Sequence, residues 1–576
     1  MKILLATSAG FCMGVRRAVE MVMDAPGKHE GPMYTYGPLI HNKQVLDLLA
    51  EKGITVMHDI PESGSGTVLI RAHGVPLDAK KRLIHAGFRV LDATCPRVIR
   101  VQSIIRKHAK QGYESIIIGD RDHPEVVGLL GYTAGRGHVV SGMEELQALP
   151  AFDRAILVSQ TTQNTRFFDA VRSYIRQHHP HYRVFDTICD STERRQAEVQ
   201  QLASDADAIL VVGDRASGNT RRLVEIAAST GKPSYHVETE ADIENLDLRE
   251  IASSRRIGIT AGASTPNWII KRVYRSVEAL RYRKAHGFRK FLFAIQHHLM
   301  LTNLYVSLGA GALSYACAVL QGLQDFWIST VIAMLYVQSM HILNHFIGSD
   351  ADRYNDPERA AFYNRHEILL RGMAFLAGGV GLLLALFLGW VPFAVLLSMS
   401  LLGMAFNLRL IPSRLTGNRY RRIRDVPGSK TVLIALAWGI LTTVFPALGE
   451  IGPATLPVFL IAAALVFVRT AFFDVLDMQG DRIVGRETIA LLLGEKQSLK
   501  LLRGILIAVF SGLLLVTTLG VVSAFGYPLL ACPAFLYLVL AGFERKQMLP
   551  GMRLEFLVET HFVLCGCLAL LWTILL

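Results

Sequence analysis

Three cysteines in the first half of the chain stand in similar local surroundings. Cys12 lies in "TSAGFCMGVRR", directly after an apolar run and directly before a predicted helix. Cys95 in "FRVLDATCPRV" and Cys189 in "YRVFDTICDST" each follow a β-branched apolar run and stand three residues after an aspartate. A thiol between a strand and a helix N-terminus has favoured thiolate character, which suits a metal ligand or a nucleophile. One such cysteine would most simply be a small buried residue in a turn, whereas three in one context indicate a shared function.

Similar spacings after each cysteine indicate an internal repeat. A glycine ends a strand-like run 25, 24 and 24 residues after the three cysteines, at Gly37, Gly119 and Gly213. Further strand-like runs then end in polar residues, in "TVLIRAHG", "AILVSQTT" and "IGITAGAST". Strands that alternate with helical stretches predict βα units and parallel sheets. Three such units predict a three-lobed, trefoil α/β domain with a pseudo-threefold relation between its lobes.

The polar residues at the carboxyl ends of these runs are the candidate site, because ligands of open α/β sheets collect there. They carry imidazoles, hydroxyls, an amide and a carboxyl group, and we expect them to surround the three thiols where the lobes meet. The first lobe contributes Cys12, His41 and His73, the second Cys95, His123, Glu125, Thr161 and Thr162, and the third Cys189, Ser217, Asn219 and Ser264.

The three thiols restrict the group that this site can hold. Disulfides are disfavoured by the odd number of thiols and by the cytosolic setting expected for this half. Structural zinc usually has four ligands in closely spaced pairs, which this half lacks. Iron–sulfur clusters normally take four cysteines, so three would leave one iron open to a substrate. The surrounding groups are good donors to a phosphate. We therefore predict a redox enzyme for a small phosphorylated alcohol.

The first half also resembles a known family. The motifs are "GFCMGVRRAV", "HNKQVLDLL", "RAHGVP", "DATCP", "GDRDHPEVVGLLGY", "SQTTQ", "DTICDSTERRQ" and "TAGASTP", and they cover residues 1–280 in order. These motifs resemble 4-hydroxy-3-methylbut-2-enyl diphosphate reductase, the IspH or LytB family. The resemblance implies a trefoil enzyme that makes isopentenyl and dimethylallyl diphosphate in the non-mevalonate route to isoprenoids.

The resemblance also implies roles for the candidate residues. Cys12, Cys95 and Cys189 would hold a [4Fe–4S] cluster, and Glu125, with Thr161, would deliver protons. The diphosphate pocket would comprise His41, His73, His123, Thr161, Thr162, Ser217, Gly218, Asn219 and Ser264. The family often has two serines before the asparagine, whereas this chain reads Ser217-Gly218-Asn219, so Gly218 offers only a backbone N–H. No G-x-G-x-x-G fingerprint for a nicotinamide cofactor opens a βα unit, so we expect ferredoxin or flavodoxin to donate the electrons.

The second half of the chain is far more apolar than the first. The whole chain is 51% hydrophobic, with mean hydropathy +0.33 and formal charge +12. Before residue 290 no window approaches the ~20 apolar residues that span a bilayer, and "MKILLATSAG" is too short for a signal peptide. Nine apolar stretches follow, at roughly 300–320, 325–346, 372–390, 391–409, 431–449, 453–471, 503–523, 526–542 and 557–576.

Charges between the apolar stretches predict the topology. Alternate connections are rich in Lys and Arg, and "RYRKAHGFRKFLFAIQHH" suits the cytoplasmic surface of a membrane. We therefore predict a multi-pass protein of the cell inner membrane, embedded in membrane lipid, with the reductase half in the cytoplasm and no nucleic-acid partner. The predicted domains are 1–282, a basic juxtamembrane linker at 283–299, and an all-α polytopic domain of about nine transmembrane helices at 300–576.

Two connections on the predicted cytoplasmic side carry acidic clusters. Asp474, Asp477 and Asp481 are spaced i, i+3 and i+7, which places them on one helical face. Charges at a helix end are often merely solvated, but facing carboxylates near a membrane suit Mg²⁺ that bridges a diphosphate. The other cluster contains Asn344, Asp350, Asp352 and Asp356.

These clusters resemble the two Asp-rich motifs of the UbiA superfamily of membrane prenyltransferases, in "NHFIGSDADRYNDP" and "DVLDMQGDRIVGRETI". The resemblance implies Mg²⁺-dependent transfer from a polyprenyl diphosphate to an unknown aromatic or lipid acceptor. The implied Mg²⁺ ligands are Asn344, Asp352, Asp474, Asp477 and Asp481. Gly348 stands where the family usually has Asp, and His345 replaces a common Asp or Asn.

The sequence also fits two alternative functions. In the first, the chain is a membrane-anchored reductase whose second half binds polyprenyl diphosphate without transferring the prenyl group. In the second, the chain is a redox sensor without turnover, which the retained His, Glu and Thr groups of the site disfavour.

Overall fold

The computed structural model describes residues 2–25, 31–245, 254–283, 288–347, 355–406, 423, 426, 428–484, 488–545 and 551–575. The chain divides into two compact units, Met1–Lys284 and Ala285–Leu576. The first unit is an α/β structure and the second is helical.

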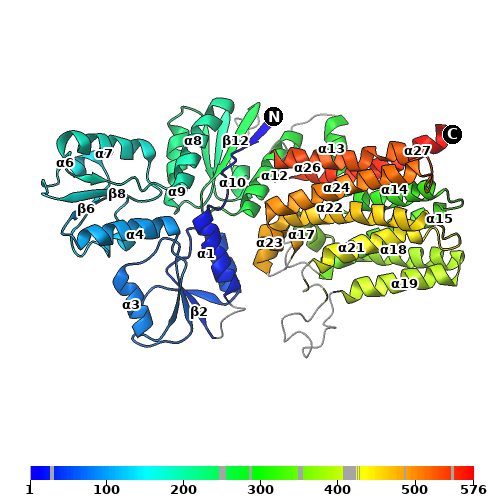
Figure 1. Ribbon diagram of the computed structural model, residues 1–576, viewed down its shortest axis with the longest axis horizontal. Helices are drawn as coiled ribbons and strands as arrows, with labels where there is room; N and C mark the ends of the chain where they lie inside the picture. Colours follow the sequence, from blue (N-terminus) through cyan, green and yellow to red (C-terminus); the bar gives the residue numbers. More distant parts are fainter. Residues whose placement is uncertain are drawn as a thin grey trace. The chain divides into compact units, whose positions relative to one another are not determined.

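The first unit contains three four-stranded sheets among the described residues, and all of their strand pairs are parallel (Figure 1). One sheet has the order β1 (Lys2–Leu5), β12 (Arg256–Ala261), β10 (Ala208–Val212) and β11 (Ser234–Val237). Another has the order β3 (Ile54–Met57), β2 (Met33–Tyr36), β4 (Thr67–Ile70) and β5 (Arg89–Asp92). The last has the order β7 (Gly137–Val140), β6 (Glu114–Ile118), β8 (Ala155–Ser159) and β9 (Arg183–Val184).

The helices of the first unit connect and cover these strands. They are α1 (Met13–Asp24), α2 (Lys43–Glu51), α3 (Leu77–His85), α4 (Pro96–Ala109), α5 (Pro124–Leu130), α6 (Met143–Gln147), α7 (Thr165–His178), α8 (Asp190–Asp205), α9 (Gly218–Ala228), α10 (Glu240–Asn245) and α12 (Asn267–Arg283). In the sheet that contains β6, the side chains of Ile116 and Ile118 pack with α7, and that of Ile117 packs with α4 and α5. The alternation of side chains along a strand therefore buries both faces of this sheet.

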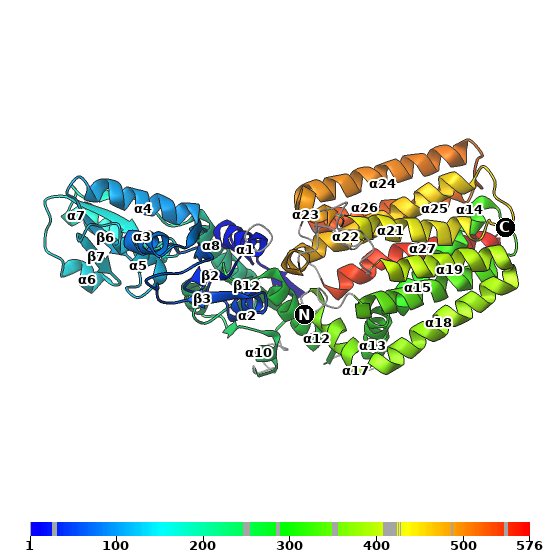
Figure 2. The same ribbon diagram turned by 90° about the horizontal axis from the view of Figure 1, so that it is seen from below.

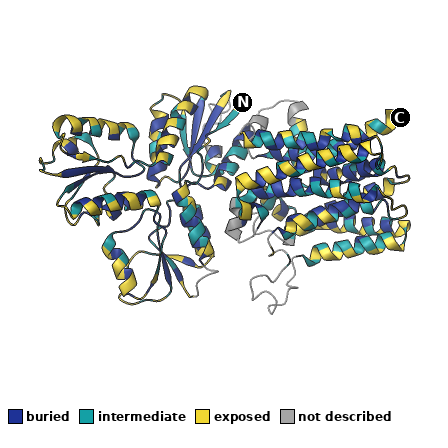
Figure 3. Ribbon diagram, viewed as in Figure 1, coloured by how far each residue is buried: buried dark blue, intermediate teal, exposed yellow. Residues whose placement is uncertain are grey.

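The strands predicted from "TVLIRAHG", "AILVSQTT" and "IGITAGAST" are confirmed as β4, β8 and β12. β4 and β8 are buried along their whole length, as is β12 except for its first residue, which explains why they read as continuous apolar runs. Figure 3 shows these strands as buried and the outer faces of the surrounding helices as exposed.

The pairing of the strands corrects how the cysteines are assigned to lobes. The sequence repeat places each cysteine at the start of its own lobe. In the structure, Cys12 follows β1, which pairs with β12 and lies at the edge of the last lobe's sheet. Cys95 follows β5 and Cys189 follows β9, which are also edge strands of the preceding sheets. Each cysteine therefore lies on the connection from one sheet to the next.

The second unit is a bundle whose long helices run side by side (Figure 2). Its described helices are α13 (Phe288–Leu301), α14 (Leu304–Gln321), α15 (Trp327–Ile347), α17 (Pro357–Arg365), α18 (Glu367–Leu388), α19 (Trp390–Ala405), α21 (Ser429–Gly439) with the π-helical η2 (Ile440–Val444), α22 (Thr455–Val484), α23 (Ile489–Leu493), α24 (Glu495–Thr518), α25 (Gly526–Leu529), α26 (Ala531–Glu544) and α27 (Met552–Leu575).

Six helices of the described part are long and apolar enough to cross a membrane. They lie at Leu304–Gln321, Glu367–Leu388, Thr455–Met478, Glu495–Thr518, Gly526–Glu544 and Met552–Leu575. The other three predicted stretches fall on α15, on the shorter α19, and on α21 with η2. Large apolar side chains such as Ile368, Phe387 and Leu575 are at least four-fifths exposed on this unit, as expected for a surface that faces lipid.

Candidate active site

Each of the three cysteines of the first unit is the N-cap residue of a helix. Cys12 precedes α1, Cys95 precedes α4 and Cys189 precedes α8. The Cys12 sulfur accepts a hydrogen bond from the Val15 N–H at 3.5 Å. A side-chain carbon at Gly14 would lie 2.5 Å from Sγ of Cys95, so α1 reaches Cys95 only because residue 14 is glycine. Burial raises the pKa of the free thiols of Cys12 and Cys95, whereas the three positive helix ends favour negative charge on sulfur that binds a metal.

All of the site residues predicted in the first half line one cavity of about 720 Å³, its open mouth included. The fold thus brings together residues from connections that follow strands of all three sheets. They are Cys12, His41, His73, Cys95, His123, Glu125, Thr161, Thr162, Cys189, Ser217, Gly218, Asn219 and Ser264. The described lining contains no fourth cysteine.

Three imidazoles form one wall of this cavity. The ring centre of His73 lies 5.0 Å from that of His41 and 5.3 Å from that of His123. Burial lowers the pKa of all three, to about 4 for His123, so all three are neutral at pH 7 in the ligand-free site. Nδ1 of His123 accepts the Glu125 N–H at 3.2 Å, which assigns the proton of the neutral ring to Nε2.

The carboxyl group of Glu125 is held against Thr161. Its two oxygens accept the Thr161 N–H at 2.6 Å and the Thr161 hydroxyl at 2.9 Å. Only 1% of Glu125 is exposed, and this burial raises the pKa of the carboxyl group to about 7 despite the two hydrogen bonds. The structure therefore places a carboxylic acid that can hold and release a proton near neutral pH at the cavity wall.

The N-terminus of α9, which follows β10, forms another wall of the cavity. Ser217 is its N-cap, and the hydroxyl of Ser264 donates to the Ser217 hydroxyl at 3.3 Å. Asn219 is buried, and its Nδ2 has no hydrogen-bond partner among the described residues. A side-chain carbon at Gly218 would lie 3.4 Å from Cδ2 of His123, which is ordinary contact. The site therefore has room for a serine side chain at residue 218, although this chain has glycine there.

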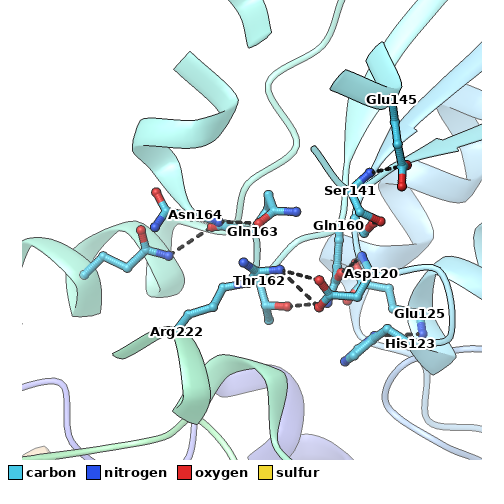
Figure 4. Close-up of polar contacts among 12 residues, drawn as sticks. Asp120, His123, Glu125, Ser141, Glu145, Gln160, Thr162, Gln163, Asn164 and Arg222 are labelled. Carbon is cyan, nitrogen blue, oxygen red and sulfur yellow. Dashed lines mark hydrogen bonds and ion pairs between the residues drawn. The ribbon is translucent and has the colours of Figure 1, made fainter. Parts of the chain in front are cut away.

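Figure 4 shows polar contacts close to His123 and Glu125 that the sequence interpretation missed. Gln160 accepts the Asp120 N–H at 3.0 Å and donates to the Thr162 hydroxyl at 2.8 Å. Arg222 of α9 donates to both carboxylate oxygens of Asp120, at 2.9 and 3.1 Å, and joins two lobes beside the cavity. Their only sequence signal is that Asp120 and Gln160 lie within the quoted motifs.

The second unit holds a separate set of carboxylates, all on α22 as predicted. Asp474 is buried, accepts the Thr431 hydroxyl at 2.5 Å and lies 3.7 Å from Nζ of Lys430. Asp481 is also buried, and it accepts a hydrogen bond from Nδ2 of Asn355 at 3.1 Å. Thr431 and Asn355 were not predicted as partners.

The remaining residues of this predicted metal site are only partly described. Asp477 is half-buried between Asp474 and Asp481 on α22, and Asn344 lies in the last turn of α15. Gly348, Asp350 and Asp352 lie outside the described residues.

Comparison with known proteins identifies both halves. Two family profiles match the chain, "LytB protein" over residues 3–278 and "UbiA prenyltransferase family" over residues 304–551. The 4-hydroxy-3-methylbut-2-enyl diphosphate reductase of Opitutus terrae is 41% identical over 292 residues, which cover 49% of this chain and 100% of the relative. The chain belongs to the 4-hydroxy-3-methylbut-2-enyl diphosphate reductase family.

A second curated relative agrees with the assignment of the first half. The 4-hydroxy-3-methylbut-2-enyl diphosphate reductase of Solidesulfovibrio magneticus is 43% identical over 289 residues, which cover 48% of this chain and 100% of that protein. A solved structure of a UbiA homologue from Aeropyrum pernix K1 is 12% identical, covers 47% of this chain and 98% of that chain, and has a TM-score of 0.38. Both predicted resemblances are confirmed: the chain joins a LytB-family reductase domain to a UbiA-family prenyltransferase domain. The second domain makes it a multi-pass membrane protein.

Proposed function

We propose that the first unit reduces 4-hydroxy-3-methylbut-2-enyl diphosphate to isopentenyl and dimethylallyl diphosphate. One observation carries this proposal: three cysteines that cap three helices border the same cavity as the buried acid Glu125. The reaction consumes two electrons and two protons, and the allylic hydroxyl leaves as water. A trefoil arrangement of the three lobes would bring the connections that carry the cysteines to one centre.

The thiols Cys12, Cys95 and Cys189 fit a [4Fe–4S] cluster in which one iron has no thiolate. Soft sulfur ligands suit such a cluster, and the described lining offers no fourth thiol. When bound, the cluster supplies single electrons and a Lewis-acidic iron. Ferredoxin or flavodoxin is the proposed source of the electrons.

The substrate diphosphate is proposed to bind where polar atoms lack partners. Nε2 of His41, Nδ1 of His73 and Nδ2 of Asn219 are buried without a hydrogen-bond partner among the described residues. A buried polar atom left unpaired is costly, so these atoms suit an anion that accepts several hydrogen bonds. The backbone N–H groups at the start of α9 would add to this pocket.

Glu125 is proposed to donate the proton that turns the leaving hydroxyl into water. Its pKa of about 7 keeps the carboxyl group protonated in a useful fraction of molecules near neutral pH. The N–H and the hydroxyl of Thr161 each donate to one oxygen of Glu125 and so fix the orientation of the carboxyl group that carries the proton. Water that enters through the mouth of the cavity would then reprotonate Glu125.

The full-length chain, purified anaerobically in detergent, tests this function directly. With reduced methyl viologen it should convert the hydroxylated diphosphate into the two products. Native protein that contains stoichiometric zinc and no iron, or that leaves the substrate unchanged, would rule the proposal out.

For the second unit we propose Mg²⁺-dependent prenyl transfer from a polyprenyl diphosphate to an aromatic or lipid acceptor. Asp474 and Asp481 are buried carboxylates on one helix, and carboxylate oxygens are the hard ligands that suit Mg²⁺. Asp474 accepts the Thr431 hydroxyl and lies 3.7 Å from Nζ of Lys430, and Asp481 accepts a hydrogen bond from Asn355. Asn344, Asp352 and Asp477 are proposed as further ligands. The proposed topology has nine spans in the inner membrane and the reductase unit in the cytoplasm.

Membranes that contain the full chain test the second function. Labelled polyprenyl diphosphates of several lengths are incubated with Mg²⁺ and a panel of aromatic and lipid acceptors, alongside the Asp481→Asn variant. Transfer by the native chain but not by the variant supports the proposal. Tight binding of the labelled diphosphate without transfer to any acceptor would favour the alternative, a membrane-anchored reductase whose second half only binds it.

A further inference from the structure

Arg195 is a buried cation beside the cysteines that has no role in the function proposed above. It lies on α8 and is 3% exposed. Its guanidinium group donates to the carbonyl of Gly10 at 2.6 Å and to the carbonyl of Ala261 at 2.9 Å. Its Nε has no hydrogen-bond partner among the described residues. The hydrogen-bond acceptors of this cation among the described residues are thus neutral carbonyls, although a buried charge is stable only when it is compensated.

The contacts of Arg195 tie together the segments that carry two of the thiols. Cys189 caps the N-terminus of the same helix, six residues before Arg195. Gly10 stands two residues before Cys12, whose N–H donates to the carbonyl of Ala263 at 3.2 Å. The guanidinium group of Arg195 therefore holds the Cys12 loop (residues 6–12) against α8, the helix that Cys189 caps.

A second contact from the same helix supports the Cys12 loop. Glu198 lies one turn after Arg195, and its carboxylate accepts the Ser8 N–H at 2.8 Å and the Thr7 hydroxyl at 2.6 Å. Burial lowers the pKa of the Arg195 guanidinium, and negative charge at Cys12, Glu198 and Cys189 opposes that shift. The loop is therefore held by one positive and one negative side chain from α8, which allows charge and positioning to be separated by experiment.

We propose that Arg195 is the countercharge of the group held by the three thiolates and makes that group easier to reduce. The inference rests on the proposed function of the first unit. Thiolates and each added electron bring negative charge into a buried site, and a fixed cation nearby lowers the energy of the more negative state. The potential of an iron–sulfur cluster responds to net charge and to hydrogen bonds at its sulfurs, and Nε of Arg195 is a spare donor. Arg195 is thus a positioning and tuning residue.

The test is a redox titration of the anaerobic full-length chain, together with its iron content, for four forms. These are the native chain, Arg195→Gln, Arg195→Lys and Glu198→Gln. Arg195→Gln should lower the midpoint potential so that, at a fixed potential, the ratio of reduced to oxidised cluster falls at least tenfold, or about 59 mV for one electron. Arg195→Lys, which keeps the charge, should stay near the native value. Glu198→Gln loosens the same loop but removes a negative charge, so it should not lower the potential.

Each possible result either supports or contradicts the role of Arg195 as countercharge. A Gln variant that is folded by circular dichroism but loses iron, while the Lys variant retains it, also supports the countercharge. A native potential in Arg195→Gln overturns the inference. Equal downward shifts in Arg195→Gln and Glu198→Gln, or loss of iron from both Arg195 variants, would show that geometry matters and charge does not. A native chain that holds no cluster would instead overturn the proposed function itself, together with this inference.

Discussion

Replacing Glu125 by glutamine tests the proton-donating role most directly. The side chain is 1% exposed, and its pKa is about 7 rather than 4.5. That difference corresponds to about 3 kcal/mol of free energy that disfavours the ionised form in the folded protein. A glutamine has nearly the same shape, can accept the Thr161 N–H and can donate to the Thr161 hydroxyl, but it never ionises. The substitution therefore removes the proton with little change in packing.

Two results are expected from Glu125→Gln. Turnover with reduced methyl viologen should fall by ~10²–10⁴-fold, the usual contribution of general acid catalysis, while iron content and substrate binding are kept. In the native chain, turnover should fall as pH rises through about 7, because the acid form is lost there. The residual turnover of the variant should lack this step.

The same shift predicts how stability depends on pH. Because the folded pKa is raised, the stabilisation from Glu125 is fully present below the unfolded pKa of 4.5 and is lost as pH rises through about 7. The variant does not titrate, so its unfolding free energy relative to the native chain should increase by up to about 3 kcal/mol between pH 4.5 and 8. Thermal unfolding of both forms at the two pH values measures this difference. Near-native turnover in the variant, or parallel pH profiles of stability, would refute the reasoning.

Other residues give further predictions. Replacing Cys12, Cys95 or Cys189 by serine should abolish iron binding, measured by iron analysis of the anaerobic protein. Retention of the full iron content would exclude the replaced thiol as a ligand. Gly218→Ser should lower the KM for the diphosphate, because a side-chain carbon there makes only ordinary contact with His123 and the new hydroxyl can donate; an unchanged KM would contradict this. After correction for the ionisation of the ligand itself, inorganic diphosphate should bind less tightly in calorimetry as pH rises from 5 to 8, since the buried imidazoles are neutral without ligand and an imidazole that takes up a proton attracts the anion more strongly; pH-independent binding would argue against them. Asp481→Asn should abolish Mg²⁺-dependent prenyl transfer and leave reduction intact, and transfer at the native rate would remove Asp481 from the metal site.

Much of the fold and most of the candidate site follow from local sequence. The strands β4, β8 and β12 are continuous apolar runs because parallel strands are covered on both faces. The cysteines stand at helix starts because an N-cap is a local feature of a few residues. The i, i+3 and i+7 spacing likewise placed Asp474, Asp477 and Asp481 on one helix.

The tertiary structure decided how these local features combine. The strand before Cys12 pairs with a strand about 250 residues later, so the sequence repeat divided the lobes one strand too early. The pKa of Glu125 depends on burial by neighbours from several segments, which no local pattern encodes. The ion pair of Asp120 with Arg222 and the contact of Asp481 with Asn355 join residues more than 100 positions apart. Periodicity and capping act over a few residues along the chain, whereas strand pairing, burial and ion pairs depend on which distant segments the whole fold brings into contact.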